Sequence, residues 1–287
     1  MYQDSNMLAS IRKVEAAREE NAKLDPRRMT AEEKETLLKK FHPDYRAEQF
    51  TELRFGPNIK DWPEMPALTN DLLVKVCSYI TDPVTTTDEL IPSGETSSYR
   101  SNPERLSEFA LSRRDPQYVG RSKVMRQIER DREAGKALPE EVMKVYEALT
   151  KAGIANDPAN TDIGSTIFAN MPGDGSAREQ AASCQRVMGA SANFAKQYAT
   201  KRYRSNCINW GMTPFLVENP EVFELGDYIF VPSIREAVLE NKASFSAYAV
   251  KPDGTVTEFP VSTGALTEAE RQIIADGCLI NYYRNNQ

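Results

Sequence analysis

Apolar residues in the first part of the chain are sparse and follow a helical period. Ile11, Val14 and Arg18 share one face that holds few other apolar side chains. A helix with such a narrow apolar face buries little surface and gains little from packing. The pattern therefore predicts that residues 1–66 form a charged helical linker or docking arm rather than a domain core.

A capping signal predicts a short helix within this arm. Thr30 and Glu33 have the spacing of a capping box, and a few apolar residues follow them as far as Phe41. The helical pattern is then interrupted by Gly56, Pro57, Pro63 and Pro66. Because proline removes a backbone donor from a helix, we place a boundary here and expect the main domain over residues 67–287.

Beyond this boundary the apolar spacing alternates between strand and helix periods. An apolar run over 72–80, closed by Pro83, predicts a strand. A second run over 166–169 leads through a glycine turn into a helix that begins near Ser176. Further strands are predicted at 214–217, 228–231, 245–250 and 256–261, and helices at 121–134, 139–152, 234–240 and 267–284. This order predicts an α/β fold in which a mixed sheet is flanked by helices.

Composition and charge narrow the classes of function. The 287 residues include 36 Lys and Arg against 42 Asp and Glu, which gives a net charge of −6. This balance argues against nucleic acid as a partner, although Arg202 and Arg204 form a local basic pair. The chain has no apolar run near the roughly 18–20 residues of a membrane span and no apolar signal region at its N-terminus. We therefore expect a cytoplasmic protein that does not enter the membrane.

The cysteines and the single histidine exclude several kinds of site. The four cysteines are far apart in the sequence and have no metal-ligand spacing: Cys77, Cys184, Cys207 and Cys278. We expect buried, reduced thiols and no metal site in this chain. The single histidine, His42, argues against Ser-His-Asp and Cys-His catalysis. Any proton transfer must therefore use another group.

The glycine turn before the Ser176 helix is the most informative segment. Glycines allow a tight turn that leaves the first N–H groups of a helix open to an anion, and Arg178 adds a two-pronged grip for a carboxylate. The alternative is purely structural. Ser176 and Glu179 have the spacing of a capping box, in which both side chains would accept hydrogen bonds from backbone N–H groups at the helix start and would bind no ligand.

A polar segment at 85–102 is a second candidate. It carries three threonines, then Asp88, and ends near Arg100. Its ordinary interpretation is a solvated surface loop with a solvated arginine. The two candidate segments meet only if the strand at 72–80 ends beside the strand at 166–169, because a rigid scaffold must position the loops that carry a site.

Four segments in order resemble one family, the C-terminal swivelling domain of aconitase and the small subunit of isopropylmalate dehydratase. They are TTTD at 85–88 with IPSG at 91–94, YRSN at 99–102, GDGSAREQAA at 173–182, and the stretch from Asn206 to Pro214. The third is similar to the family signature Gly-x-Gly-Ser-Ser-Arg-Glu-His-Ala, with Ala177 and Gln180 in place of its second serine and its histidine. The resemblance covers about residues 70–287 and implies a swivel-type β/β/α domain.

The resemblance also implies an activity and a set of site residues. The activity is that of a hydro-lyase, which moves water across a carbon–carbon double bond of a di- or tricarboxylic acid. Ser176 matches the family's serine base, Arg100 and Arg178 match the arginines that hold substrate carboxylates, and Asp88 matches an acidic residue near the reacting centre. Thr87 and Ala177 occupy substrate-binding positions of the same motifs.

What the resemblance implies about cofactor and partner lies outside this chain. The family's [4Fe–4S] cluster is bound by three cysteines of a larger domain or subunit, and it takes the leaving hydroxyl. We therefore expect this chain to be active only with a cluster-bearing partner. The alternatives are a non-catalytic module that binds an anion or RNA, and an inactive paralogue with the same fold.

Overall fold

The computed structural model describes residues 30–41 and 55–286, and the chain divides after Gly56 into two compact units. In the first unit, the described segment is helix α2, Ala31–Phe41. Its capping box is formed as predicted: the Thr30 N–H donates to Glu33 Oε2 at 2.7 Å, and the Glu33 N–H donates to Thr30 Oγ1 at 3.2 Å. The predicted helical face of Ile11, Val14 and Arg18 lies outside the described residues.

A seven-stranded mixed sheet forms the centre of the second unit. Its strands, in spatial order, are β6 (Thr213–Leu216), β5 (Ala190–Ala195), β3 (Thr161–Ala169), β1 (Asp71–Ile80), β7 (Tyr228–Val231), β8 (Phe245–Val250) and β9 (Val256–Val261). The first four run parallel, and β7, β8 and β9 continue the sheet antiparallel. A bridge between Leu216 and Ser262 links β6 to the residue after β9, so the sheet is curled. The predicted mixed sheet is confirmed.

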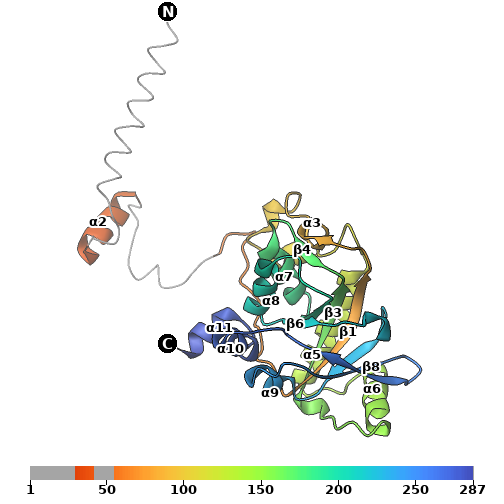
Figure 1. Ribbon diagram of the computed structural model, residues 1–287. Coiled ribbons are helices and arrows are strands. Elements are labelled where there is room, and N and C mark those ends of the chain that lie inside the picture. The colour runs from red at the N-terminus through yellow and green to blue at the C-terminus, as the bar shows by residue number, and fades with distance from the viewer. Residues whose placement is uncertain (1–29, 42–54, 287) are drawn as a thin grey trace, which may run out of the picture. The chain divides into compact units, whose positions relative to one another are not determined.

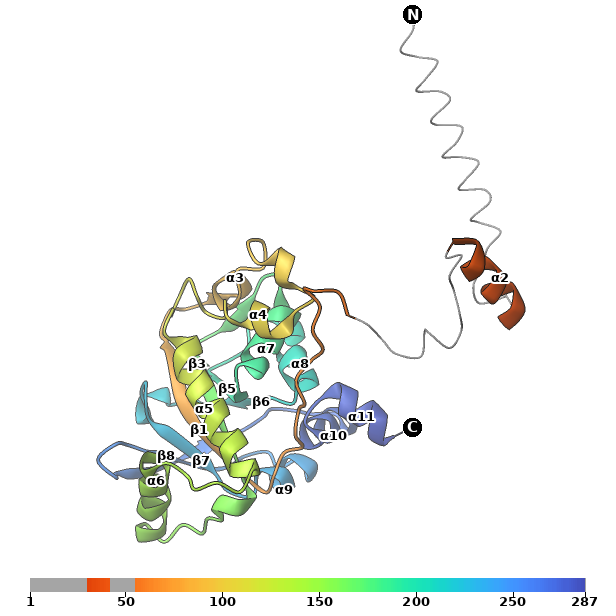
Figure 2. The same cartoon turned by 180° about the vertical axis from the view of Figure 1, so that it is seen from behind.

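Helices cover both faces of this sheet (Figure 1 and Figure 2). The longer ones are α5 (Tyr118–Glu133), α6 (Glu140–Lys151), α7 (Arg178–Val187), α8 (Lys201–Asn209), α9 (Ile234–Leu239), α10 (Glu268–Asp276) and α11 (Leu279–Asn285). Alternate residues of β1 point to opposite faces. Leu73 and Cys77 pack in the core with α5, α6 and α7, while Leu72 and Val74 pack in a second core with α9 and α10.

The polar segment at 85–102 is more structured than predicted. It contains strand β2 (Thr85–Thr86), helix α3 (Thr87–Leu90) and a 3₁₀ turn at Ser97–Tyr99, and helix α4 (Pro103–Ser107) follows. A capping box between Thr86 and Glu89 starts α3, a local signal that the sequence analysis did not use. Strand β2 pairs in parallel with β4, Pro172–Asp174.

Two further elements differ from the expectation. Strand β5 was not predicted, because alanine and serine give its sequence ASANFA a weak strand pattern. The single helix predicted over 267–284 is two helices, because Gly277 adopts a φ of +90° and ends α10. A side chain at that position would collide with the backbone of Pro66.

Residues 57–66, which precede the predicted boundary, belong to the same compact unit as the sheet. This unit begins at Pro57. The Lys60 N–H donates to the Ser101 carbonyl at 3.0 Å. The ring centroids of Trp62 and Trp210 are 4.3 Å apart. The assignment of the residues upstream as a linker or docking arm stays a prediction.

Candidate functional site

The ends of neighbouring strands bring the two candidate segments together. Ile80, the last residue of β1, pairs with Ala169, the last residue of β3. The chain leaves both strands at the same edge, and Thr86 of β2 then pairs with Asp174 of β4. Helix α3 therefore begins beside the glycine turn that precedes α7, as the sequence analysis required for a shared site.

Thr87 holds this junction together. Its side chain is buried, and its Oγ1 accepts a hydrogen bond from the Ala177 N–H at 3.3 Å. Gly175 packs against the same hydroxyl with a φ of +133°, and a Cβ there would collide with Thr87 Oγ1. A glycine is needed at this position for both reasons. In this structure Thr87 is a scaffold residue of the turn, and it does not line the hollow described next.

A hollow of about 310 Å³ lies at the start of α7. It is lined by Ser93, Arg100, Ser176, Ala177, Glu179 and Gln180. Three of the predicted site residues, Arg100, Ser176 and Ala177, thus share one open pocket. Ser93 and Gln180 were quoted only as parts of motifs, and their place in the hollow depends on the folded path of the 91–102 segment.

The capping box of Ser176 and Glu179, the structural alternative for this segment, does not form. Helix α7 begins at Arg178, its N-cap is Ala177, and no side chain caps it. The turn through Gly175 places Ser176 one residue before the N-cap, so Ser176 does not act as the capping residue. Ser176 is exposed on the hollow, and its hydroxyl is free of a capping bond in the part of the chain that the structure describes.

The two predicted carboxylate-binding arginines differ in their surroundings. Arg100 follows the 3₁₀ turn, is exposed on the hollow, and forms no ion pair with any described residue. Arg178 is half-buried in the first turn of α7, and its Nε is buried without a hydrogen-bond partner among the described residues. Arg178 is not among the residues that line the hollow, and its role in binding a carboxylate stays a prediction.

Asp88 lies on α3 next to Thr87, but its carboxylate does not line the hollow. It forms an ion pair with Arg113, whose guanidinium also binds Glu95. The two carboxylates raise the pKa of Arg113, with the Glu95 hydrogen bond as the largest cause. The predicted place of Asp88 near a reacting centre stays a prediction.

Glu179 has a partner that the sequence analysis missed. Its Oε1 accepts a hydrogen bond from the indole Nε1–H of Trp210 at 3.1 Å. Trp210 follows α8 as its C-cap residue, and its ring lies against Trp62 with the two planes tilted by 43°. No sequence signal connects these positions, because they come from three separate segments.

The cysteines do not form a cluster site. All four are free and buried: Cys77, Cys184, Cys207 and Cys278. Burial raises the pKa of Cys77, Cys184 and Cys207 to about 12, which keeps these thiols protonated and unlike cluster ligands. Within residues 30–41 and 55–286, no group of three His, Cys, Asp or Glu side chains could hold a metal ion. These residues therefore do not fit an iron–sulfur cluster.

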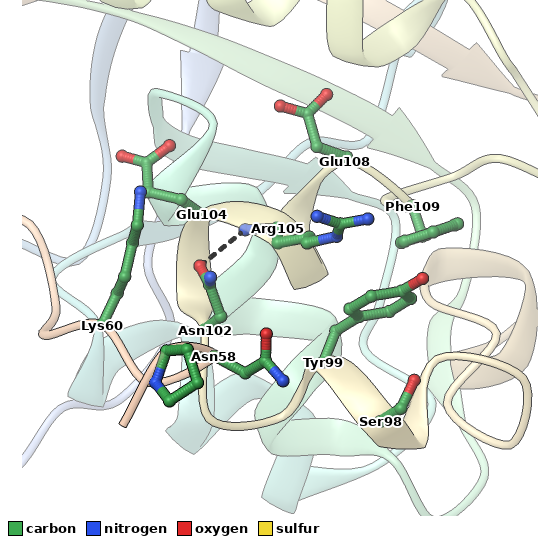
Figure 3. Close-up of a pocket in the computed structure, with 10 residues that line it drawn as sticks. Asn58, Lys60, Ser98, Tyr99, Asn102, Glu104, Arg105, Glu108 and Phe109 are labelled. Atoms are coloured by element: carbon green, nitrogen blue, oxygen red, sulfur yellow. Dashed lines mark hydrogen bonds between the residues drawn. The ribbon is translucent and has the colours of Figure 1, made fainter. Parts of the chain in front are cut away.

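A larger hollow of about 780 Å³ is lined by residues of the 3₁₀ turn, of α4 and of the segment 57–60 (Figure 3). Tyr99 stacks on Phe109 with ring centroids 5.4 Å apart, and the Arg105 guanidinium lies 4.9 Å from the centre of the Tyr99 ring. Glu104 and Glu108 balance the positive charges on its wall. None of the predicted site residues lines this hollow, although Tyr99 directly precedes Arg100.

Among the described residues, no helix is both long enough and apolar enough to cross a bilayer.

The chain is similar to known proteins in sequence and in fold. No protein-family model matches the chain. The methanogen homoaconitase small subunit of Methanocaldococcus jannaschii is 30% identical over 138 residues, which are 47% of this chain and 72% of that protein. The crystal structure of 3-isopropylmalate dehydratase (leuD) from the same species aligns with a TM-score of 0.45 and 20% identity, covering 75% of this chain and 95% of that one.

Proposed function

The chain belongs to the family of aconitase-like swivel small subunits, and from this premise we propose that it is the swivel part of a hydro-lyase. The proposed reaction is the dehydration and rehydration of a di- or tricarboxylic hydroxy acid. Ser176 is its base, and Arg100 and Arg178 bind the substrate carboxylates. Thr87 and Ala177 shape the binding site, and Asp88 lies close to the reacting centre.

The observation that carries this proposal is the shared hollow of Ser176 and Arg100. A base and a carboxylate-binding cation must face the same space, and here they come from segments 76 positions apart. Ser176 is also free of the capping role that was its structural alternative.

The chemistry follows from what these residues can do. Ser176 Oγ, as the alkoxide, takes a proton from the carbon next to a carboxylate, and it returns that proton in the reverse reaction. The N–H groups at the start of α7 and the positive end of that helix favour the anionic form of a neighbouring oxygen. Arg178, in the first turn of α7, carries a planar guanidinium that can bind one substrate carboxylate while Arg100 binds another.

A partner completes the proposed enzyme. The described residues supply no cluster ligands, so we propose that a [4Fe–4S] cluster is held by a larger domain or subunit of the same enzyme. We propose that the chain is inactive alone and acts in the cytoplasm. The four free buried thiols support that location, since secreted proteins commonly pair their cysteines.

The direct test is reconstitution. The full chain is assayed with citrate, isocitrate and isopropylmalate, alone and then with a cluster-bearing large subunit, with the Ser176→Ala chain as the matched control. We expect turnover only in the mixture with the unmodified chain. Turnover by the chain alone, or equal turnover by the Ser176→Ala mixture, would contradict the proposal.

A second candidate has one specific observation in its favour. Ala177 and Gln180 both line the hollow, so one hydroxyl and one titratable ring of the family signature are replaced there. These losses favour a non-catalytic anion-binding or RNA-binding module or an inactive paralogue. Filter binding of RNA across a salt series distinguishes the RNA-binding form, because phosphate contacts require a steep salt dependence. Absence of turnover with each large subunit, combined with retained citrate binding, would favour the anion-binding form.

A further inference from the structure

Both tryptophans of the chain lie in one pair beside the candidate site. The sequence has two, Trp62 and Trp210, and their ring centroids are 4.3 Å apart with planes inclined by 43°. Trp62 comes from the segment that leads into the domain, and Trp210 comes from the end of α8. Both rings are half-buried.

The pair continues into the hollow through one hydrogen bond. Trp210 Nε1–H donates to Glu179 Oε1 at 3.1 Å, and Glu179 is a wall residue of the hollow that holds Ser176 and Arg100. An indole N–H is a donor only, so its direction is fixed by the orientation of the ring. The contact with the tilted ring of Trp62 in turn restricts that orientation.

This arrangement matters because the hollow contains opposite charges. Glu179 and Arg100 line the same space, yet they form no ion pair, and Arg100 has no other ionic partner among the described residues. An exposed carboxylate near an unpaired guanidinium normally competes for it with any anionic ligand.

We propose that the indole N–H of Trp210 is a positioning group that holds the Glu179 carboxylate away from Arg100, which leaves the guanidinium free for a substrate carboxylate. This inference rests on the proposed function for its substrate. Trp62 supports this positioning through the contact between its ring and the ring of Trp210. The segment that carries Trp62 is also held by a hydrogen bond from the Lys60 N–H to the carbonyl of Ser101, the residue after Arg100.

The kinetic test uses the reconstituted enzyme and isosteric aromatic changes. Trp210→Phe keeps an aromatic ring against Trp62 and removes the donor, so we expect KM to rise about two- to fivefold, the size of one competing exposed ion pair, with kcat little changed. Tyr283→Phe is the control, because this exposed aromatic residue on α11 does not line the hollow, and its KM should equal that of the unmodified enzyme. Adding Glu179→Gln to Trp210→Phe removes the competing charge and should restore KM. A merely structural role would not be rescued in this way.

A spectroscopic test needs no turnover. With ¹⁵N-labelled tryptophan, the full chain gives two indole N–H signals, which the Trp62→Phe variant assigns. In the Glu179→Gln chain, we expect the Trp210 signal to move upfield as its acceptor loses charge, and the Trp62 signal to stay in place.

The two tests separate the inference from the function. An unmoved Trp210 signal, or a Trp210→Phe enzyme with unchanged KM, would overturn the positioning role even if reconstitution succeeds. If no large subunit restores turnover, the proposed function fails, and the indole signals still decide whether Trp210 holds Glu179.

Discussion

The hydroxyl of Thr87 accepts a hydrogen bond from the backbone N–H of Ala177, a residue 90 positions further along the chain. This bond joins the start of α3 to the residue that caps α7, and Ser176 lies directly before that cap. The position of the proposed base therefore depends on a contact between two segments that no local pattern connects.

Replacing Thr87 with valine should weaken this junction. Valine keeps the volume but leaves the Ala177 N–H without its acceptor, and a lost buried hydrogen bond costs about 1–2 kcal/mol. For a domain of this size we expect Tm to fall by roughly 2–8 °C, together with a lower kcat/KM in the reconstituted enzyme. Thr87→Ser keeps the hydroxyl and is the control, measured by the same thermal scan. Equal Tm values for the valine and serine variants would show that the bond contributes nothing.

Ser176→Ala should affect turnover without affecting stability. Ser176 does not cap α7, so the free energy of unfolding should change by less than about 0.5 kcal/mol, as for an ordinary surface substitution. Loss of the proton acceptor should lower kcat by about 10²–10⁴-fold and leave KM within about twofold. Steady-state kinetics and thermal unfolding measure the two effects separately.

Ser98→Ala is the matched control for this variant, because Ser98 lies in the larger neighbouring hollow. It should leave both kinetic constants unchanged. A Ser176→Ala enzyme with normal turnover would remove this residue from the mechanism.

The contrast between α7 and the strands shows what the sequence could predict. The bounds of β7, β8 and β9 match the predicted ranges, because apolar spacing and the turn at 252–254 are local signals. Helix α7 begins at Arg178, two residues after Ser176, and its N-cap is Ala177, so the spacing of Ser176 and Glu179 does not produce a capping box. A capping box in the sequence states a possibility, and the backbone path decides whether it forms.

The residues of the candidate site could likewise be predicted from the sequence, whereas their contacts could not. Motif resemblance selected Arg100 and Ser176, which share the hollow. It could not show that Asp88 is paired with Arg113, or that Glu179 is bound by Trp210, because both partners come from other elements and their contacts depend on side-chain direction.

Arg178→Lys should weaken substrate binding and slow turnover together. Lysine keeps the charge but presents a single flexible ammonium where the guanidinium offers a planar fork. Charge-assisted hydrogen bonds contribute about 1.5–3 kcal/mol, so we expect KM to rise at least about tenfold and kcat to fall. Arg202→Lys on the exposed surface of α8 is the control and should leave both constants unchanged. If the two lysine variants behave alike, Arg178 does not bind a substrate carboxylate.

The last prediction concerns a buried carboxyl far from the proposed chemistry. Asp162 lies at the start of β3, within a cluster that includes Glu129, Arg132 and Arg186. Burial raises the pKa of Asp162 from 3.8 to about 7, and the negative charge of Glu129 adds to the rise. Glu129 is itself held by Arg132, at 2.7 Å between Oε1 and Nη2.

Between pH 4 and pH 7, Asp162 therefore keeps its proton in the folded protein, whereas the same carboxyl has lost it in the unfolded chain. In that window the folded state binds more protons, so the free energy of unfolding contributed by this group falls as pH rises, and the loss is complete above pH 7. Asp162→Asn mimics the neutral carboxyl, so we expect it to raise Tm at pH 8 and to change Tm little at pH 5. Thermal unfolding of both chains from pH 5 to pH 8 measures the difference. A variant that is equally destabilised at both pH values would show that Asp162 is ionised and favourably paired in the folded state.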